Sequence, residues 1–377
     1  MTADRIEPDC VLSAGDLLFA RSGATVGKTY LHEDMSVPAI FGGYCIRFRL
    51  DPERALPQFV YLFTKTSMCE RWIAAIQRPS GQPNINKEEF KALLLPLPPV
   101  TQQQKLVAAV NLARANRTRK LAQAEELLHG IDEFLLDEIG VHPQAADGSR
   151  VCYAIRLHES DSSRLDARFY APQIRRLEVA IREAAGVVPL ESLLSARPVN
   201  GVDARGFSDS GIRYLRVQNV RPYRLSFDGI TRVPAREKTK AVITRGDVLL
   251  TRKGTFGVAA VVPEDAEDCM ISSEVMLLRL AADSGCSPEY LTAWLNSSVA
   301  GEIFGRHSAG GIMGHLTQRV VCAFPVPVPS PEKQRRIALG LSSRLDAASR
   351  LQAEADAEWE AAKAQLEHHL LEPTGEA

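Results

Sequence analysis

The chain has 377 residues, a net formal charge of −1 and 24% charged residues, which is typical of a globular protein with two to three domains. No apolar run is long enough for a transmembrane helix, and the first residues lack the basic start and apolar core of a signal peptide. The sequence therefore predicts a cytoplasmic protein with no membrane partner. The seven cysteines are scattered without a CxxC pair, and the histidines lack metal-ligand spacing, so we expect no bound metal.

A segment near the N-terminus returns later in the chain. Residues 15–23, GDLLFARSG, reappear as GDVLLTRKG at 246–254, and 246 minus 15 gives an offset of 231. The same offset relates further identical pairs: Ile40 and Ile271, Pro57 and Pro288, Gln103 and Gln334. A repeat of this length indicates a duplicated domain rather than a solenoid of small units. The second copy is preceded by a long stretch with no counterpart, so we expect the first copy to lack its front half.

Each copy ends in a proline-rich strap, at 93–99 and 324–331. Proline removes a backbone donor and restricts the preceding residue, so both straps should be extended and should end a domain. The stretch after each strap carries apolar residues at spacings of three and four, which predicts a long amphipathic helix that must bury its stripe against another helix. We expect the two helices to pair antiparallel. We also expect them to provide a subunit interface, which these residues would form: Leu106, Val110, Leu121, Leu128, Leu341, Leu345, Leu351 and Trp359.

The second copy contains further predicted elements. After a linker at 143–149, a helix is expected near 174–185, strands at 214–217, 247–251 and 258–262, and a helical stretch at 288–304 that matches 57–76. The expected fold class is α+β, with short strands. The predicted domains are a partial first module (1–99), a first long helix (100–142), a complete second module (143–330) and a second long helix (331–377).

Residues 23–29, GATVGKT, are similar to a phosphate-binding loop. That loop needs four residues between its glycines and a helix after them, whereas here three residues intervene and turn and strand residues follow. The second copy, at 254–258, has no lysine. We therefore interpret the glycines as a tight hairpin turn in both copies. No nucleophile constellation or methyltransferase motif is present, so no catalytic residue is expected.

Polar and basic residues recur at the turns of both copies. Arginine with Gln or Asn can read base edges, while Ser, Thr, Lys and glycine amides can hold phosphates. Solvated loop polarity is the alternative for any one residue, but the recurrence favours a DNA-binding surface for the set. The candidates are Arg216, Gln218, Asn219, Arg252, Lys253, Thr255, Arg306, His307 and Ser308 in the second copy, and Arg21, Ser22, Lys28, Arg78, Gln82 and Asn84 in the first.

The order of these motifs resembles the specificity (S) subunit of type I restriction–modification systems. The resemblance rests on YLRVQNV at 214–220, the two GD segments, FPVPVP at 324–329 and the glutamines after each strap. It implies tandem target recognition domains, each followed by a long helix, with the two helices packed as an antiparallel coiled-coil spacer. It also implies a non-catalytic reader of a split target in double-stranded DNA. The chain would position methyltransferase (M) subunits, which bring S-adenosylmethionine, and a restriction (R) subunit can join; the chain itself would bind no cofactor.

The incomplete first module departs from the family pattern. Three explanations stay open: a start site placed too far downstream, a split arrangement completed by another chain, or a degenerate module. The near-neutral charge also keeps open an alternative function, that of a structural adaptor whose helices organise a complex without reading DNA.

Overall fold

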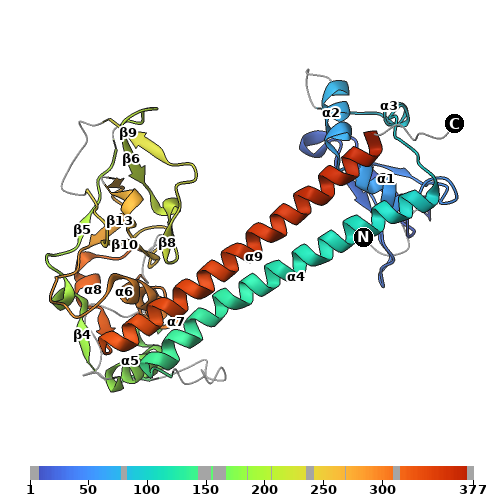
Figure 1. Cartoon of the computed structure of the whole chain (residues 1–377). Helices are drawn as coiled ribbons and strands as arrows, with labels where there is room; N and C mark the ends of the chain where they lie inside the picture. The colour runs from blue at the N-terminus through green and yellow to red at the C-terminus, as the bar shows by residue number, and fades with distance from the viewer. Residues whose placement is uncertain are drawn as a thin grey trace. The chain divides into compact units, whose positions relative to one another are not determined.

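The computed structural model describes residues 8–77, 83–142, 154–155, 167–184, 186–204, 206–234, 242–267, 269–308 and 315–371. Contacts divide the chain into two compact units. One comprises Met1–Ala124 and Ser349–Ala377, and the other comprises Glu125–Ala348. Each unit holds one α+β domain and parts of two long helices (Figure 1).

The domain of the first unit is a small antiparallel sheet packed against short helices. Its strands are β1 (Leu17–Ala20), β2 (Thr29–Leu31) and β3 (Cys45–Phe48), in the order β2-β1-β3. Its helices are α1 (Pro57–Phe63), α2 (Ser67–Ile76) and α3 (Lys87–Lys91). Leu17 and Phe59 are fully buried in a core that also takes in Val110 and Leu366 from the two long helices. The long helices are therefore part of the domain's hydrophobic core.

The domain of the second unit contains the same motif with additions. The matching strands are β10 (Val248–Thr251), β11 (Ala259–Val261) and β13 (Val275–Leu278), and the matching helices are α6 (Pro288–Leu295), α7 (Ser298–Ser308) and α8 (Gln318–Cys322). The additions before β10 are α5 (Pro172–Glu183), β4 (Val187–Pro189), β5 (Val199–Asn200), β6 (Ile212–Leu215), β7 (Val220–Arg221), β8 (Arg224–Leu225) and β9 (Thr231–Val233). Two short strands, β12 (Met270–Ile271) and β14 (Pro325–Pro327), pair with added strands β6 and β4.

The repeat offset changes inside the domain. Gly27 and Gly257 both turn the chain with positive φ between the paired strands, and 257 minus 27 gives 230. Bridges Val11 to Ile40 and Val242 to Met270 show that Ile40 corresponds to Met270, so the predicted match with Ile271 is wrong by one residue. The second copy has one residue fewer between its turn glycines, and the offset returns to 231 at Pro57 and Pro288.

The helical stretches predicted at 57–76 and 288–304 are each two helices. Thr66 and Ser297 stand at the breaks, where their hydroxyls donate to the carbonyls of Phe63 and Trp294. Thr66 Oγ1 also accepts the amide of Cys69, and Ser297 Oγ accepts the amide of Ala300. A residue that caps the next helix adopts extended backbone, which ends the helix before it.

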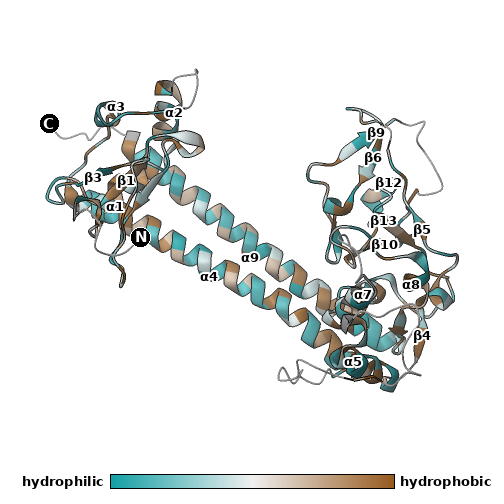
Figure 2. Cartoon of the chain, turned by 180° about the vertical axis from the view of Figure 1, so that it is seen from behind, coloured by the Kyte–Doolittle hydropathy of each residue, from teal (hydrophilic) through white to brown (hydrophobic). Residues whose placement is uncertain are grey.

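Two long helices, α4 (Val100–Ile139) and α9 (Pro331–Leu371), follow the straps. In each unit their segments lie side by side and antiparallel (Figures 1 and 2). In the second unit Phe134 packs beside Gly340, and Glu138 pairs with Arg336 further along. Gly140 has a φ of +73° directly after α4, the left-handed conformation that commonly ends a helix at glycine.

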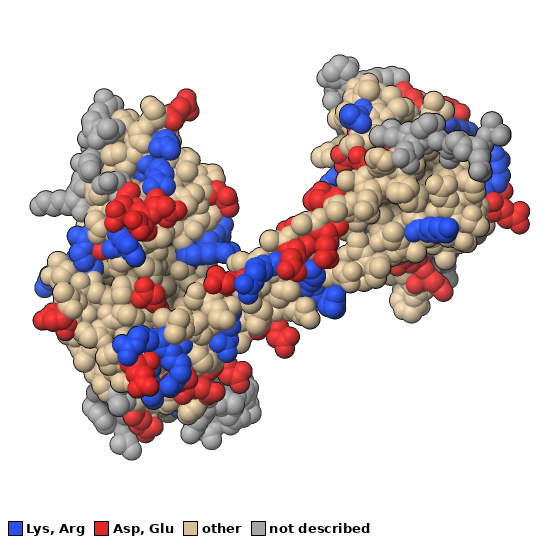
Figure 3. All heavy atoms as spheres, viewed as in Figure 1, with Lys and Arg blue, Asp and Glu red and all other residues tan. Residues whose placement is uncertain are grey.

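Ion pairs interrupt the apolar contact between the helices in the first unit. Arg117 pairs with Asp356 at 2.9 Å, and Lys120 Nζ lies 2.7 Å from Glu354 and 2.8 Å from Glu358. Figure 3 shows such acidic and basic side chains gathered on the helices. Glu354, Asp356 and Glu358 of α9 thus help to hold α4 in place.

These ion pairs predict a pH dependence of helix pairing. The hydrogen bond from Lys120 lowers the pKa of Glu354, and that from Arg336 lowers the pKa of Glu138, below the ordinary value of 4.5. A depressed carboxyl pKa gives stability that is present above pH 4.5 and is lost as the pH falls through the folded-state value. Both pairs are exposed, so the effect should be small. We expect acidification below pH 4.5 to lower the Tm of the native chain more than that of a Glu138→Gln/Glu354→Gln variant, measured by circular dichroism; equal shifts would contradict it.

The predicted α+β fold class with two long helices is confirmed. The linker at 143–149 lies outside the described residues. None of the described helices is both long and apolar enough to cross a membrane.

Candidate nucleic-acid interface

One segment predicted to bind DNA, residues 252–255, lies beside a second loop in the second domain. The turn after β10 forms a bridge from Lys253 to His315, and Leu316 donates its amide to the Arg252 carbonyl at 2.8 Å. The chain between β10 and β11 thus lies beside the segment that enters α8. Lys253 and Thr255 are exposed at this junction, so they are free to meet a ligand.

The first domain repeats this junction. Ser22 bridges to Asn84, and Ile85 donates its amide to the Arg21 carbonyl at 2.8 Å. Lys28 and Asn84 are exposed, and Arg21 and Ser22 are half-buried. We call each of these junctions a loop pair: residues 21–28 with 83–86 in the first domain, and residues 252–257 with 315–317 in the second.

Arg252 supports its loop pair from inside. Its Nε donates to the Leu316 carbonyl at 3.3 Å, and its Nη1 donates to the Ser273 carbonyl at 3.1 Å. Two of its five donors are therefore taken by backbone carbonyls from two other segments. This geometry makes Arg252 a residue that positions the loop pair, and it makes Lys253 the better candidate for a DNA contact.

Two other predicted DNA contacts have roles inside the second domain. Asn219 is fully buried, and its side chain accepts the Arg216 amide and donates to the Ser226 and Asp228 carbonyls. Arg306 pairs with Glu178 of α5 and lies 4.0 Å from the ring centre of Phe169. Because both side chains are engaged in contacts inside the domain, we do not place either of them on a DNA-binding surface.

Of the remaining predicted DNA-binding residues, Gln218 and Arg216 have described side chains. Gln218 is exposed beside the half-buried Arg216, whose guanidinium lies 6.0 Å from the Phe207 ring centre. Arg78 and Gln82 lie outside the described residues. His307 and Ser308 end α7, but their side chains also lie outside the described part of the structure.

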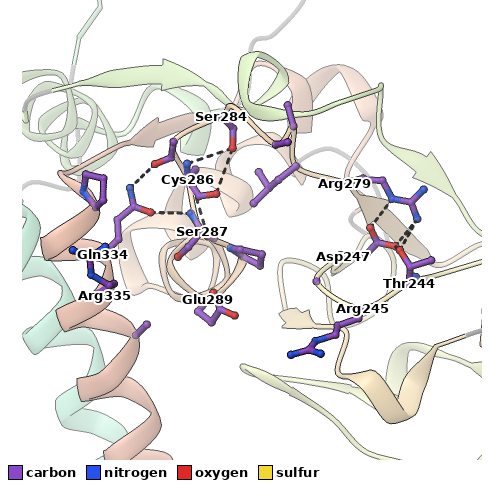
Figure 4. Close-up of a pocket in the computed structure, with 18 residues that line it drawn as sticks. Thr244, Arg245, Asp247, Arg279, Ser284, Cys286, Ser287, Glu289, Gln334 and Arg335 are labelled. Atoms are coloured by element: carbon purple, nitrogen blue, oxygen red, sulfur yellow. Dashed lines mark hydrogen bonds and ion pairs between the residues drawn. The ribbon is translucent and has the colours of Figure 1, made fainter.

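A hollow of about 600 Å³ in the second unit lies at the other end of β10 (Figure 4). Gln334 lines one side of it, accepting the Ser287 amide at 2.8 Å and donating to the Gly285 and Pro329 carbonyls. Asp247, also buried, accepts the Thr244 amide and pairs with Arg279 at 2.6 Å. The Asp247 carboxylate raises the pKa of Arg279, and burial raises the pKa of Cys286 to about 12. The Cys286 thiol therefore stays protonated at neutral pH and is no nucleophile.

Both features recur in the first unit. Gln103 accepts the Leu56 amide at 2.9 Å and donates to the Arg54 and Pro98 carbonyls, and Asp16 accepts the Ser13 amide and an Arg49 donor. The recurring Gly-Asp and Gln of the sequence are therefore structural. They fix the start of a strand and the join between strap and long helix.

A pair of serine contacts holds each domain to a helix. The backbone amide and hydroxyl of Ser298, at the start of α7, donate to Asp132 of α4 at 2.8 and 2.6 Å. Ser67, at the start of α2, donates in the same way to Glu367 of α9. Sequence reasoning missed these contacts, because the partners lie 166 and 300 residues apart in the chain.

The predicted interface residues of the long helices vary in burial. Val110 and Leu341 are buried between the helices and the domains, and Leu128 is 38% exposed. The others are half-buried: Leu106, Leu121, Leu345, Leu351 and Trp359. Their role as a subunit interface stays a prediction.

The loop similar to a phosphate-binding loop is a hairpin turn, as interpreted from the sequence. Gly23 and Gly27 have φ values of +80° between the antiparallel strands β1 and β2. A Cβ on Gly27 would lie 2.6 Å from Ile73, so the turn has no room for a side chain. Within the described part of the chain, no group of three or more His, Cys, Asp or Glu side chains could hold a metal ion.

Comparisons with known proteins agree with this arrangement. Residues 7–117 match the family model of the type I restriction modification DNA specificity domain. No curated protein sequence matches the chain. A chain from a structure concerned with complex assembly and conformational transition of the type I R-M system has 18% identity and a TM-score of 0.60. The match covers 97% of this chain and 84% of that chain.

Two further solved structures are similar over most of the chain. The HsdS subunit from Thermoanaerobacter tengcongensis has 16% identity and a TM-score of 0.45, covering 98% of this chain and 84% of that one. The S subunit of a type I restriction-modification system from M. genitalium has 12% identity and a TM-score of 0.48, covering 97% and 86%. The chain therefore shares the fold of a chain from a type I R-M system, and its residues 7–117 match the type I restriction modification DNA specificity domain.

Proposed function

We propose that the chain reads a split target in double-stranded DNA and positions adenine methyltransferase subunits on its two long helices. The observation that supports the DNA contact most is the loop pair, which both domains build in the same way and at whose surface they expose Lys28 and Lys253. Cationic and amide side chains on rigidly joined loops suit phosphate and base-edge contacts. In this proposal residues 1–99 and 143–330 are the recognition modules, and 100–142 and 331–377 are the spacer helices.

The chemistry of methylation belongs to the partner. S-adenosylmethionine would be bound by the M subunit, and an R subunit could add cleavage to the same complex. Methylation-site mapping of host DNA with and without the gene tests the proposal. We expect adenine methylation of a two-part target to disappear with the gene, and unchanged methylation would contradict a DNA-reading role.

Lys253→Ala tests the loop pair of the second domain. Loss of one phosphate contact should weaken binding to all DNA sequences alike and reduce the slope of log affinity against log salt by about 1. The matched control is Arg335→Ala, because Arg335 is exposed at the hollow at the other end of β10. Binding measured by fluorescence anisotropy at several salt concentrations decides it. If both substitutions weaken DNA binding equally, the loop pair is not part of the DNA-binding surface.

A further inference from the structure

A turn of the second domain lies directly beside its loop pair. Residues 272–274 form this turn, which connects β12 to β13. The Arg252 amide donates to the Glu274 carbonyl at 2.8 Å, and Arg252 Nη1 donates to the Ser273 carbonyl at 3.1 Å. The arginine that positions the loop pair therefore also fixes the turn.

The added strands hold the same turn from other directions. Ser272 donates its amide to the carbonyl of the last residue of β6 at 2.9 Å, and the Ser273 hydroxyl donates to Asp203, which lies shortly after β5. Gly201 approaches so closely that a Cβ there would lie 2.2 Å from the Ile271 carbonyl oxygen, so no larger residue fits. Contacts to segments at the ends of β5, β6 and β10 thus fix the backbone of the turn.

Glu274 is the exposed residue of this fixed turn. Ser272 is buried and Ser273 is half-buried, whereas the Glu274 side chain reaches solvent. Within the described ranges, its carboxylate has no hydrogen-bond or ion-pair partner. Lys253, which follows the arginine that holds the turn, is exposed as well. A free carboxylate on a fixed backbone loses little freedom when it meets a donor, because preorganisation lowers the ordering cost of binding.

The first domain makes the same backbone contact with a different side chain. The Arg21 amide donates to the Tyr44 carbonyl at 2.8 Å, as the Arg252 amide does to that of Glu274. Tyr44 is 75% exposed, and Glu274 is exposed although added strands pack around its turn. One position, held alike in both domains, thus carries an aromatic ring in one and a carboxylate in the other. This is the pattern expected where two domains read different bases.

A carboxylate at this position would discriminate among the bases. An ionised carboxylate only accepts hydrogen bonds. In the major groove guanine presents two acceptors, and thymine presents an acceptor and a methyl group. Adenine presents a donor beside an acceptor, which suits the amide of Asn or Gln, whereas cytosine presents its N4 amino donor, which suits Glu or Asp. Among the four bases, cytosine therefore matches Glu274 best.

We propose that Glu274 is a specificity-determining residue whose carboxylate accepts a hydrogen bond from the N4 amino group of a cytosine in the target. The proposal rests on the proposed DNA-reading function and adds one base to it: the half-target read by the second domain contains a C·G pair that depends on Glu274. The positive charge of Lys253 offsets part of the repulsion between this carboxylate and the phosphates, since opposite charges near a protein surface screen each other.

Methylation-site mapping in the host tests the proposal with the whole complex. The gene is replaced by one encoding Glu274→Gln and, separately, by one encoding Glu274→Ala. We expect Glu274→Gln to change one cytosine of the methylated target to adenine, because Gln matches adenine N6 and N7. Glu274→Ala should accept any base at that position. Every other position of the target should stay as it is with the native chain.

Glu289→Gln is the matched control. Glu289 is also an exposed carboxylate of the second domain, but it lines the hollow at the other end of β10. The same chemical change there should leave the methylated target unaltered. Because Glu274 is exposed, circular dichroism should show all three variants folded as the native chain is.

Binding of the purified complex to duplexes that differ only at this base pair gives the size of the effect. The native chain should prefer the C·G duplex about tenfold or more, and Glu274→Ala should lose that preference. If Glu274 only repels phosphates, both Glu274 variants will bind every duplex more tightly and methylate the native target, which overturns the proposal. Loss of methylation at all sites by a folded Glu274 variant overturns it as well.

Failure of this assignment can be told apart from failure of the DNA-reading function. If deleting the gene leaves methylation unchanged, the chain does not read DNA and both proposals fall. If methylation depends on the gene but the target is the same with Glu274→Gln and Glu274→Ala, only the role of Glu274 is refuted.

Discussion

Replacing Leu341 with aspartate should unfold the paired helices of the second unit. Leu341 is 7% exposed and belongs to one core with Ile131 and Leu135 of α4. An unpaired carboxylate in that core should cost about 3–5 kcal/mol, a large part of the stability of an ordinary domain. We expect a fall in Tm measured by circular dichroism and, if the helices carry the M subunits, loss of their co-purification.

Leu339→Asp is the matched control for this substitution. It places the same charge on the same helix two residues earlier, at a side chain that is 72% exposed. Its free energy of unfolding should stay within about 0.5 kcal/mol of that of the native chain, as for most surface substitutions. Leu345 and Leu351, chosen from the sequence, are half-buried and should give smaller effects than Leu341. Similar losses from Leu339→Asp and Leu341→Asp would mean that the helices do not pair through this core.

Replacing Gln103 with leucine should destabilise the first unit through unpaired backbone groups. The Gln103 side chain is fully buried and is the partner of the Leu56 amide and the Arg54 and Pro98 carbonyls. A buried polar group that loses its partner costs about 1–3 kcal/mol, so the total should reach about 3 kcal/mol or more. We expect a lower Tm and faster hydrogen exchange of the Leu56 amide.

Gln104→Leu is the control, since Gln104 is the neighbouring glutamine and is exposed. It makes the same chemical change without touching the buried carbonyls. If both variants melt at the same temperature, the buried amide does not hold the strap to the helix.

The repeat in the sequence predicted the elements that depend on local chemistry. Gly15 and Gly246 turn the chain with positive φ before β1 and β10, and the apolar spacing after each strap forms α4 and α9. These features follow from backbone freedom and helical periodicity, which a short window of sequence contains.

The functional assignment of single residues depended on distant partners and could not be predicted in the same way. Arg306 and Asn219 are used inside the second domain, by Glu178 and by the carbonyls of Ser226 and Asp228. Glu178 lies in the segment that the first copy lacks, so comparing the copies gave no sign of it. Likewise, one residue fewer between the turn glycines shifted the pairing of Ile40, which a fixed offset could not reveal.

The serine contacts have a consequence for how such chains can diversify. Ser67 belongs to the domain that precedes α4 but is held by Glu367 of α9, and Ser298 belongs to the domain that precedes α9 but is held by Asp132 of α4. Each domain therefore needs a single carboxylate on the opposite helix for this contact, and the loop pair takes no part in it. A domain exchanged by recombination would keep this contact if it brought a serine to the start of the corresponding helix. New loops could then be acquired with this contact to the opposite helix unchanged.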